Sequence, residues 1–201
     1  MEAARLCSEI LLAHAMQCER LRLFTQYEQV PGPDVLAAFR ESVRQAAAGR
    51  PVAYITGTKE FFSLRLEVTP DVLIPRPETE ILVERVIHLV RRGDNPRPAI
   101  LDLCTGSGCI AIALARHLPE AQLAASDVSP AALAVARRNA ERHELDARIA
   151  WRCGDLLAPW GRAAAADESA WAPPAFDIIV CNPPYIAESQ AAMLPVTVRE
   201  H

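Results

Sequence analysis

The residues with the clearest chemical potential form a glycine-containing loop. The loop runs from Asp102 to Gly108 with the sequence DLCTGSG, between a short apolar segment and an apolar helical one. Glycines allow a sharp backbone turn and let a ligand approach the main chain closely. Asp127 lies 21 residues beyond Gly106, and a carboxylate there can accept hydrogen bonds from both ribose hydroxyls. The spacing therefore predicts a ligand that contains a nucleoside.

Two cofactors are compatible with this loop. The pattern Gly106-x-Gly108-x-x-Ala111 also fits the dinucleotide fingerprint. A dinucleotide would place its pyrophosphate at the helix N-terminus, where Asp102 would repel it. S-adenosylmethionine instead carries an ammonium and a sulfonium, which a nearby carboxylate favours. We therefore predict S-adenosylmethionine, and an NAD-dependent dehydrogenase is the weaker alternative.

A second motif lies late in the chain and consists of Asn182, Pro183, Pro184 and Tyr185. Two successive prolines fix φ at both positions and remove two N–H donors. What remains is a pair of acceptors, the side-chain carbonyl of Asn182 and the carbonyl of Pro183. Two rigid acceptors can bind both hydrogens of a planar NH2 group, and Tyr185 offers an aromatic face. The motif therefore predicts a site for a planar amine or amide.

The chemistry of an amide substrate fits this motif. An amide nitrogen is a poor nucleophile because its lone pair is delocalised into the carbonyl. Accepting hydrogen bonds from both N–H groups returns electron density to the nitrogen and orients it. Such alignment can supply roughly 7–11 kcal/mol of a barrier. Asn182 and Tyr185 are the predicted catalytic residues, and Asn182, Pro183, Pro184 and Tyr185 the predicted substrate-binding residues.

No metal site is predicted. The six cysteines include no C-x-x-C pair, and the five histidines are scattered without an H-E-x-x-H pattern. Methyl transfer from S-adenosylmethionine to such an amide nitrogen requires no metal and no histidine base, because the nitrogen becomes strongly acidic as it is alkylated.

Alternating strands and helices are expected to position both motifs. From Pro77 onward, a helix ending at Gly93 precedes four short apolar segments. The predicted strands are 99–103, 122–127, 148–152 and 177–181, with helices at 109–118 and after Ser129-Pro130. Apolar strands separated by helices indicate a parallel sheet covered on both faces. The carboxyl ends of such strands are where ligands bind.

The part before Pro77 has a different pattern. Residues 1–50 repeat apolar side chains at helical spacing, and Pro33 starts a helix that Gly49 ends. Residues 61–74 alternate like a β-hairpin that turns at Thr69-Pro70-Asp71. Residues 158–175 show no period and are predicted to be a loop. We predict three regions: a helical domain at 1–58, a hairpin linker at 59–76 and a cofactor-binding domain at 77–201.

The bulk properties favour a soluble cytoplasmic protein. The 201 residues are 51% hydrophobic and 23% charged, and no apolar run approaches the length of a membrane helix. The net charge of −4 gives no support for direct contact with nucleic acid. A doubly wound sheet normally continues past its fourth strand, so we expect the chain to be truncated after 177–181.

The chain resembles the peptide chain release factor glutamine methyltransferases. The resemblance covers essentially the whole chain and rests on Asp102–Gly108, Asn182–Tyr185 and three further segments: PVAYITG at 51–57, EFFSL at 60–64 and IPRPETE at 74–80. The last is the most specific. Related enzymes for a ribosomal-protein glutamine usually lack its PETE portion, so the segment favours release factors.

The resemblance implies a doubly wound class I methyltransferase fold with a helical N-terminal domain and a hairpin linker. It also implies N5-methylation of the glutamine in the Gly-Gly-Gln loop of class I release factors, which the N-terminal domain would contact. Cofactor contacts carry over to Asp127, the Asp155-Leu156 pair, Asn182 and the loop residues Asp102, Cys104, Thr105, Gly106, Ser107 and Gly108. Arg76 and Glu78 are expected to help close the pocket.

The sequence departs from the family at three points. Cys104 replaces the usual first glycine of the loop, which is tolerable if its φ is negative. The match begins partway into the helical domain, and the family continues beyond His201. The alternatives left open are a ribosomal-protein glutamine methyltransferase, a nucleic-acid methyltransferase acting on adenine N6 or guanine N2, and an inactive binding fragment.

Overall fold

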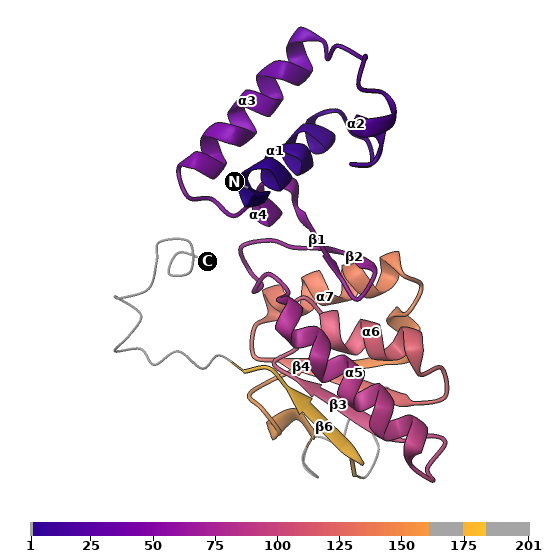
Figure 1. The fold of residues 1–201 in the computed structure, drawn as a ribbon. Coiled ribbons are helices and arrows are strands. Elements are labelled where there is room, and N and C mark those ends of the chain that lie inside the picture. Colours follow the sequence, from indigo (N-terminus) through magenta and orange to yellow (C-terminus); the bar gives the residue numbers. More distant parts are fainter. Residues whose placement is uncertain (1, 161–174, 184–201) are drawn as a thin grey trace. The chain divides into compact units, whose positions relative to one another are not determined.

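The computed structural model describes residues 2–160 and 175–183, which separate into two compact units (Figure 1). The division falls between Gly57 and Thr58. The first unit is helical and the second combines helices with two sheets. Pro184 and Tyr185, two of the predicted site residues, lie outside the described residues.

The described residues of the first unit form four helices, as its apolar periodicity predicts in outline. They are α1 (Glu2–Ala15), α2 (Arg22–Thr25), α3 (Pro33–Ala47) and α4 (Val52–Thr56). Helix α3 begins at Pro33, as predicted, and Gly49 has a φ of +97° just beyond its end. Helix α1 contacts α3 and α4, and its Leu11 is buried. Helix α3 itself has no buried residue, so this unit has a small core.

The second unit begins with a β-hairpin whose turn lies elsewhere than predicted. Strands β1 (Thr58–Phe61) and β2 (Leu64–Glu67) pair antiparallel, and the chain turns at Phe62-Ser63. These two residues have φ values of +49° and +61°. Tight hairpin turns of this kind normally carry Asn-Gly or Asp-Gly, so Phe-Ser gave no turn signal. Thr69-Pro70-Asp71 does form a turn, but after the hairpin, with Val72 N–H donating to the Thr69 carbonyl.

In the part of the chain that the structure describes, the main sheet has four parallel strands in the order β5-β4-β3-β6. The strands are β3 (Ala99–Leu103), β4 (Gln122–Asp127), β5 (Ile149–Cys153) and β6 (Ile178–Cys181). The helices are α5 (Pro77–Arg92), α6 (Cys109–His117) and α7 (Pro130–Arg142). Helix α7 starts as predicted, with Pro130 in its first turn and the Ser129 side chain accepting a hydrogen bond from Ala132 N–H. All four strands match their predicted positions within one residue.

Helices α5, α6 and α7 pack on one face of the sheet (Figure 1). The core on that face joins α5, α6, α7 and the hairpin to alternate strand residues such as Ile100, Leu123 and Ile149. The opposite face, with Leu101, Leu103 and Ala124, packs against Trp160 and Phe176. Helices were predicted on both faces. The two crossovers from β3 to β4 and from β4 to β5 run in the same direction, and right-handed connections therefore place α6 and α7 on the same side.

One segment predicted to be a loop contains a short ordered turn. Ala158–Trp160 forms a 3₁₀ helix, η2, at the start of the predicted 158–175 loop. The Trp160 indole donates to Ser126 Oγ at 3.0 Å, and its ring lies edge-on to Phe176. Polar and aromatic contacts of Trp160 therefore hold this turn on the sheet, although the surrounding sequence has no period.

Candidate functional site

The register of the sheet brings the two predicted motifs together. Leu103 in β3 is paired with Cys181 in β6, so the next residues, Cys104 and Asn182, leave neighbouring strands at the same edge. Asp127 ends β4 at that edge. From β3 the chain adds β4 and β5 on one side, and β6 then pairs with the other side of β3. The gap between β3 and β6 is therefore a topological switch point. Ligands of open α/β sheets bind at such points.

The loop after β3 has a backbone that depends on its glycines. Gly106 and Gly108 have φ values of +54° and +80°, a region that other residues rarely adopt. A Cβ on Gly108 would also lie 3.0 Å from Ile112 Cδ1 and 3.1 Å from Ala136 Cβ, so this glycine lets α6 and α7 approach. A Cβ on Gly106 would have no atom within 4 Å. Gly106 therefore leaves open space against which a ligand can lie.

Cys104 is strained in a way that the sequence did not foresee. Its φ is +57°, so the negative φ that would make a cysteine tolerable in place of the usual glycine is not met. A Cβ in the left-handed region approaches the carbonyl oxygen and costs about 1–2 kcal/mol. The family glycine is thus explained by the backbone, and the cysteine keeps the conformation at an energetic cost.

Asp102 supports the loop from below. Its side chain is fully buried, and Oδ2 accepts hydrogen bonds from Thr105 Oγ1 at 2.6 Å and from Ala111 N–H at 3.1 Å. Burial raises its pKa to about 7, partly offset by these two hydrogen bonds. The other oxygen, Oδ1, is buried without a partner among the described residues. Asp102 therefore orients the loop and retains one buried acceptor that a cationic N–H donor or a water would satisfy.

Asp127 holds the loop from the neighbouring strand. Its Oδ2 accepts a hydrogen bond from Gly106 N–H at 2.9 Å, and its Oδ1 accepts one from Ser129 N–H at 3.0 Å. A carboxylate has about four lone-pair sites, so each oxygen keeps capacity for a further donor. The predicted contact with ribose hydroxyls stays a prediction, and the geometry allows it.

The charge around the loop is negative. The pKa of Cys104 is raised, first by burial and then by the carboxylates of Asp127, Asp102 and Asp155. Asp155 and Leu156 follow β5 at the same edge and are exposed, with Leu156 at a φ of +44°. The carboxylates of Asp127 and Asp155, with Asp102 as a further buried acceptor, suit a cofactor with ammonium and sulfonium groups and oppose a pyrophosphate. This group of acidic side chains therefore fits S-adenosylmethionine better than a dinucleotide.

Asn182 is held by Thr79, for which the sequence predicted no role of its own within the segment IPRPETE. Its Nδ2 donates to Thr79 Oγ1 at 3.2 Å, and Thr79 is buried in the first turn of α5. Pro183 is exposed beside it. Arg76 and Glu78, the flanking residues that were expected to close the pocket, are both exposed. The segment IPRPETE thus reaches the second motif through its threonine.

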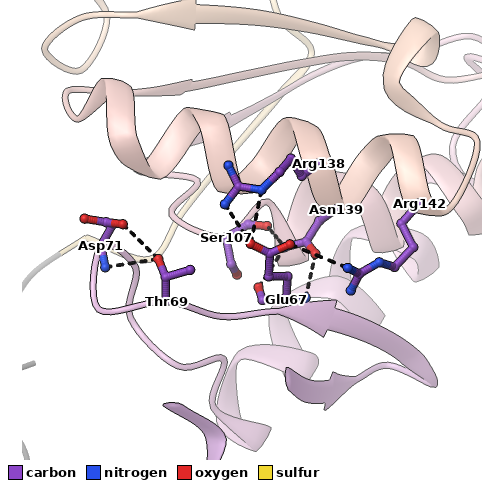
Figure 2. A network of polar contacts seen from close by, with 7 residues as sticks. All are labelled: Glu67, Thr69, Asp71, Ser107, Arg138, Asn139 and Arg142. Atoms are coloured by element: carbon purple, nitrogen blue, oxygen red, sulfur yellow. Dashed lines mark hydrogen bonds and ion pairs between the residues drawn. The ribbon is translucent and has the colours of Figure 1, made fainter. Parts of the chain in front are cut away.

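Sequence reasoning missed a buried asparagine that connects the loop to the hairpin (Figure 2). Asn139 in α7 is fully buried, and its Nδ2 donates to the carbonyls of Ser107 and Glu67, both at 3.0 Å. Its Oδ1 accepts from Glu67 N–H at 2.6 Å. Arg138 and Arg142 pair with the exposed side of Glu67. An asparagine on the apolar face of a helix, where it is intrinsically unfavourable, is the signal that could have found it.

Other features of the described residues lie outside this site. A cavity of about 520 Å³ lies at the amino ends of β4 and β5, lined by Arg137, Arg148 and Trp151 among others, and contains none of the predicted residues. Within residues 2–160 and 175–183, no group of three His, Cys, Asp or Glu side chains is arranged to hold a metal ion. Nor does any helix in that part of the chain have the length and apolar character to cross a membrane.

Comparison with solved structures defines the class of protein. The crystal structure of the hMettl16 catalytic domain in complex with MAT2A 3′UTR hairpin 6 aligns with a TM-score of 0.50 and 22% identity. The alignment covers 70% of this chain and 46% of that one. With the strand order and the loop geometry, this likeness assigns the second unit to the class I methyltransferase fold. The Methyltransferase small domain family matches residues 78–198.

Sequence relatives define the family more narrowly. The PrmC N-terminal domain family matches residues 1–57. A Release factor glutamine methyltransferase of Rhodopirellula baltica is 43% identical over 99% of this chain, and one of Chlorobaculum tepidum is 42% identical over 100% of it. The chain belongs to the release factor glutamine methyltransferase family. It spans 64% and 67% of the length of these two relatives.

Proposed function

We propose that this protein transfers a methyl group from S-adenosylmethionine to the side-chain amide nitrogen of a glutamine in a class I peptide chain release factor. The observation that carries this proposal is the pairing of Leu103 with Cys181, because it leaves Asn182 beside the loop that begins at Cys104. The names of the family's curated members support glutamine and release factors as the substrate class. The proposed acceptor is the glutamine of the Gly-Gly-Gln loop.

The cofactor half of the site is assigned to the loop and the strand ends around it. The proposed cofactor-binding residues are Asp102, Cys104, Thr105, Gly106, Ser107, Gly108, Asp127, Asp155, Leu156 and Asn182. S-adenosylmethionine supplies an electrophilic methyl group whose leaving group is a neutral thioether. The open space at Gly106 receives the ligand, and Asp127 offers acceptors to its ribose. Asp102 acts mainly through the loop that it holds.

The substrate half positions the acceptor nitrogen. The Asn182 and Pro183 carbonyls accept hydrogen bonds from the two amide N–H groups. These bonds raise the electron density on the nitrogen and direct its lone pair toward the methyl group. As the N–C bond forms and the C–S bond breaks, the nitrogen becomes acidic and releases a proton to solvent. Tyr185 is proposed to pack against the amide plane. Release factors act on ribosomes, so the reaction would take place in the cytoplasm.

The test is a methyl-transfer assay with labelled cofactor and four acceptors: a class I release factor, ribosomal protein, RNA and DNA. We expect label on the release factor. A release factor with its Gly-Gly-Gln glutamine replaced by alanine is the matched control and should take up no label. Label on nucleic acid alone, or equal label on the alanine control, would overturn the proposal.

A further inference from the structure

The first turn of α5 contacts the site through a buried hydroxyl. Thr79 is 6% exposed, and its Oγ1 accepts a hydrogen bond from Asn182 Nδ2 at 3.2 Å across 103 positions of sequence. The hydrogen-bonding ends of an asparagine side chain have opposite roles, because Nδ2 donates and Oδ1 accepts. Binding one end therefore decides what the other end offers. Oδ1 accepts no hydrogen bond from the described residues.

The orientation of this carboxamide decides whether Asn182 can bind an amide NH2. An NH2 group needs acceptors, and an asparagine turned by half a revolution would present N–H donors to it instead. The terminal torsion of asparagine is broad and roughly two-fold, so the side chain does not select an orientation by itself. A fixed partner is required.

We propose that Thr79 is a positioning residue that holds Nδ2 of Asn182 and so keeps Oδ1 available as the acceptor for the substrate nitrogen. This inference rests on the proposed function of Asn182. It gives the segment IPRPETE a chemical role that its exposed residues, Arg76 and Glu78, do not supply. An acceptor fixed in this way favours a substrate nitrogen that carries an N–H hydrogen.

The turn that carries Thr79 is held from several sides. Thr79 N–H donates to the Arg76 carbonyl at 3.0 Å. The next residue, Glu80, accepts a hydrogen bond through Oε1 from Phe62 N–H at 2.8 Å, in the turn of the hairpin. Farther along α5, Val83 and Val86 are buried in the core. The Thr79 hydroxyl therefore has a fixed position, as a residue that orients another must have.

The kinetic experiment compares Thr79→Val, which keeps the shape and loses the hydroxyl, with Thr79→Ser, which keeps the hydroxyl. We expect Thr79→Val to lower kcat about 3–10-fold, the range for one hydrogen bond, with cofactor Kd unchanged. Thr79→Ser should remain near the unmodified protein. A serine variant as slow as the valine variant, or a valine variant with weakened cofactor binding, would overturn the inference in favour of a packing role.

A double-mutant cycle tests whether Thr79 acts through Asn182. In the Asn182→Ala background, Thr79→Val should cause no further loss of kcat, because the group that it orients is gone. Multiplicative losses would show an independent effect and contradict the proposal.

A spectroscopic arm needs no methyl acceptor. The side-chain 15N–1H resonances of Asn182 are identified by their absence in Asn182→Ala. Thr79→Val should shift them and speed their hydrogen exchange, whereas Thr79→Ser should leave them in place. Unchanged resonances in Thr79→Val would overturn the contact. A protein that methylates no glutamine would instead overturn the proposed function, and the resonances would still decide the role of Thr79.

Discussion

The loops after β3 and after β6 lie side by side at one edge of the sheet but are held in different ways. The loop after β3 is anchored by Asp102, Asp127 and Asn139, all within about 35 residues of it. The side chain that begins the loop after β6 is held by Thr79, a residue 103 positions earlier. The loop of the cofactor half is thus anchored by residues that are close to it in the sequence. The substrate half depends on α5, a helix that precedes β3 in the chain and reaches Asn182 only through tertiary packing.

Because the two loops are held by different residues, cofactor binding and the chemical step should be separable in this protein. A change in a residue that anchors the loop after β3 should alter the stability of the fold, whereas a change in the motif that begins at Asn182 should alter turnover.

Asp102 should make the stability of the second unit fall as pH rises. Its pKa is about 7 in the fold, against a usual value of 3.8, because it is buried. Between pH 4 and 7 the folded state holds a proton that the unfolded state has released. This proton contributes up to roughly 4 kcal/mol to the free energy of unfolding. The contribution is fully present below pH 4 and is lost as the pH rises to about 7. Urea unfolding at several pH values measures it.

The matched variant for this measurement is Asp102→Asn, which cannot ionise yet keeps an acceptor for Thr105 and Ala111. Its unfolding free energy should vary less with pH across the same window. Parallel curves for the two proteins would show that Asp102 is not the titrating group.

Asn182→Ala should separate the two halves of the site. We expect turnover to fall about 10²–10³-fold, by analogy with loss of a preorganised polar group. Cofactor affinity should stay largely intact, because Asn182 is only one of several proposed cofactor contacts. Single-turnover methyl transfer and calorimetric binding of the cofactor measure the two quantities. Unchanged turnover would refute the role of Asn182, and a parallel loss of cofactor affinity would show that the halves are not separable.

Asn139→Ala should weaken the anchoring of the first loop and the hairpin together. It removes partners from the Glu67 N–H and from the carbonyls of Glu67 and Ser107, so we expect a loss of about 2–3 kcal/mol in unfolding free energy. The control is Glu67→Gln, which removes only the ion pairs with Arg138 and Arg142. Those arginine side chains are about half exposed, at 48% and 46%, so the control should cost less than about 1 kcal/mol.

Similar losses in both variants would contradict the expectation that Asn139 contributes more stability than the ion pairs of Glu67. They would mean that the charged surface of the network in Figure 2 contributes as much as its buried asparagine.

Cys104→Gly should stabilise the protein slightly. The φ of +57° is strained for cysteine and free for glycine, so we expect a gain of about 0.5–1 kcal/mol, with a higher Tm. Cys104→Ala is the control, because it removes the thiol and keeps the Cβ that causes the strain. Equal effects of the two variants would assign the change to the thiol instead of the backbone.

Much of this architecture follows from the sequence alone. The four strands of the sheet, the start of α7 at Pro130 and the placement of the glycine loop all depend on short-range patterns of apolar residues, prolines and caps. The proximity of Cys104 and Asn182 also follows once the strands are parallel, because parallel strands end at one edge. These features are local or topological, so one chain is enough to predict them.

The tertiary structure decided the rest. The Phe62-Ser63 turn carries no glycine, and contacts that include Glu80 hold it in place. The positive φ of Cys104 depends on how the loop is held between Asp102 and Asp127. Thr79 and Asn139 become site residues only when distant segments pack, because a hydrogen bond across 103 or 72 positions leaves no periodic trace in the sequence. Pairing at that range is fixed by packing, and packing is read only from the folded chain.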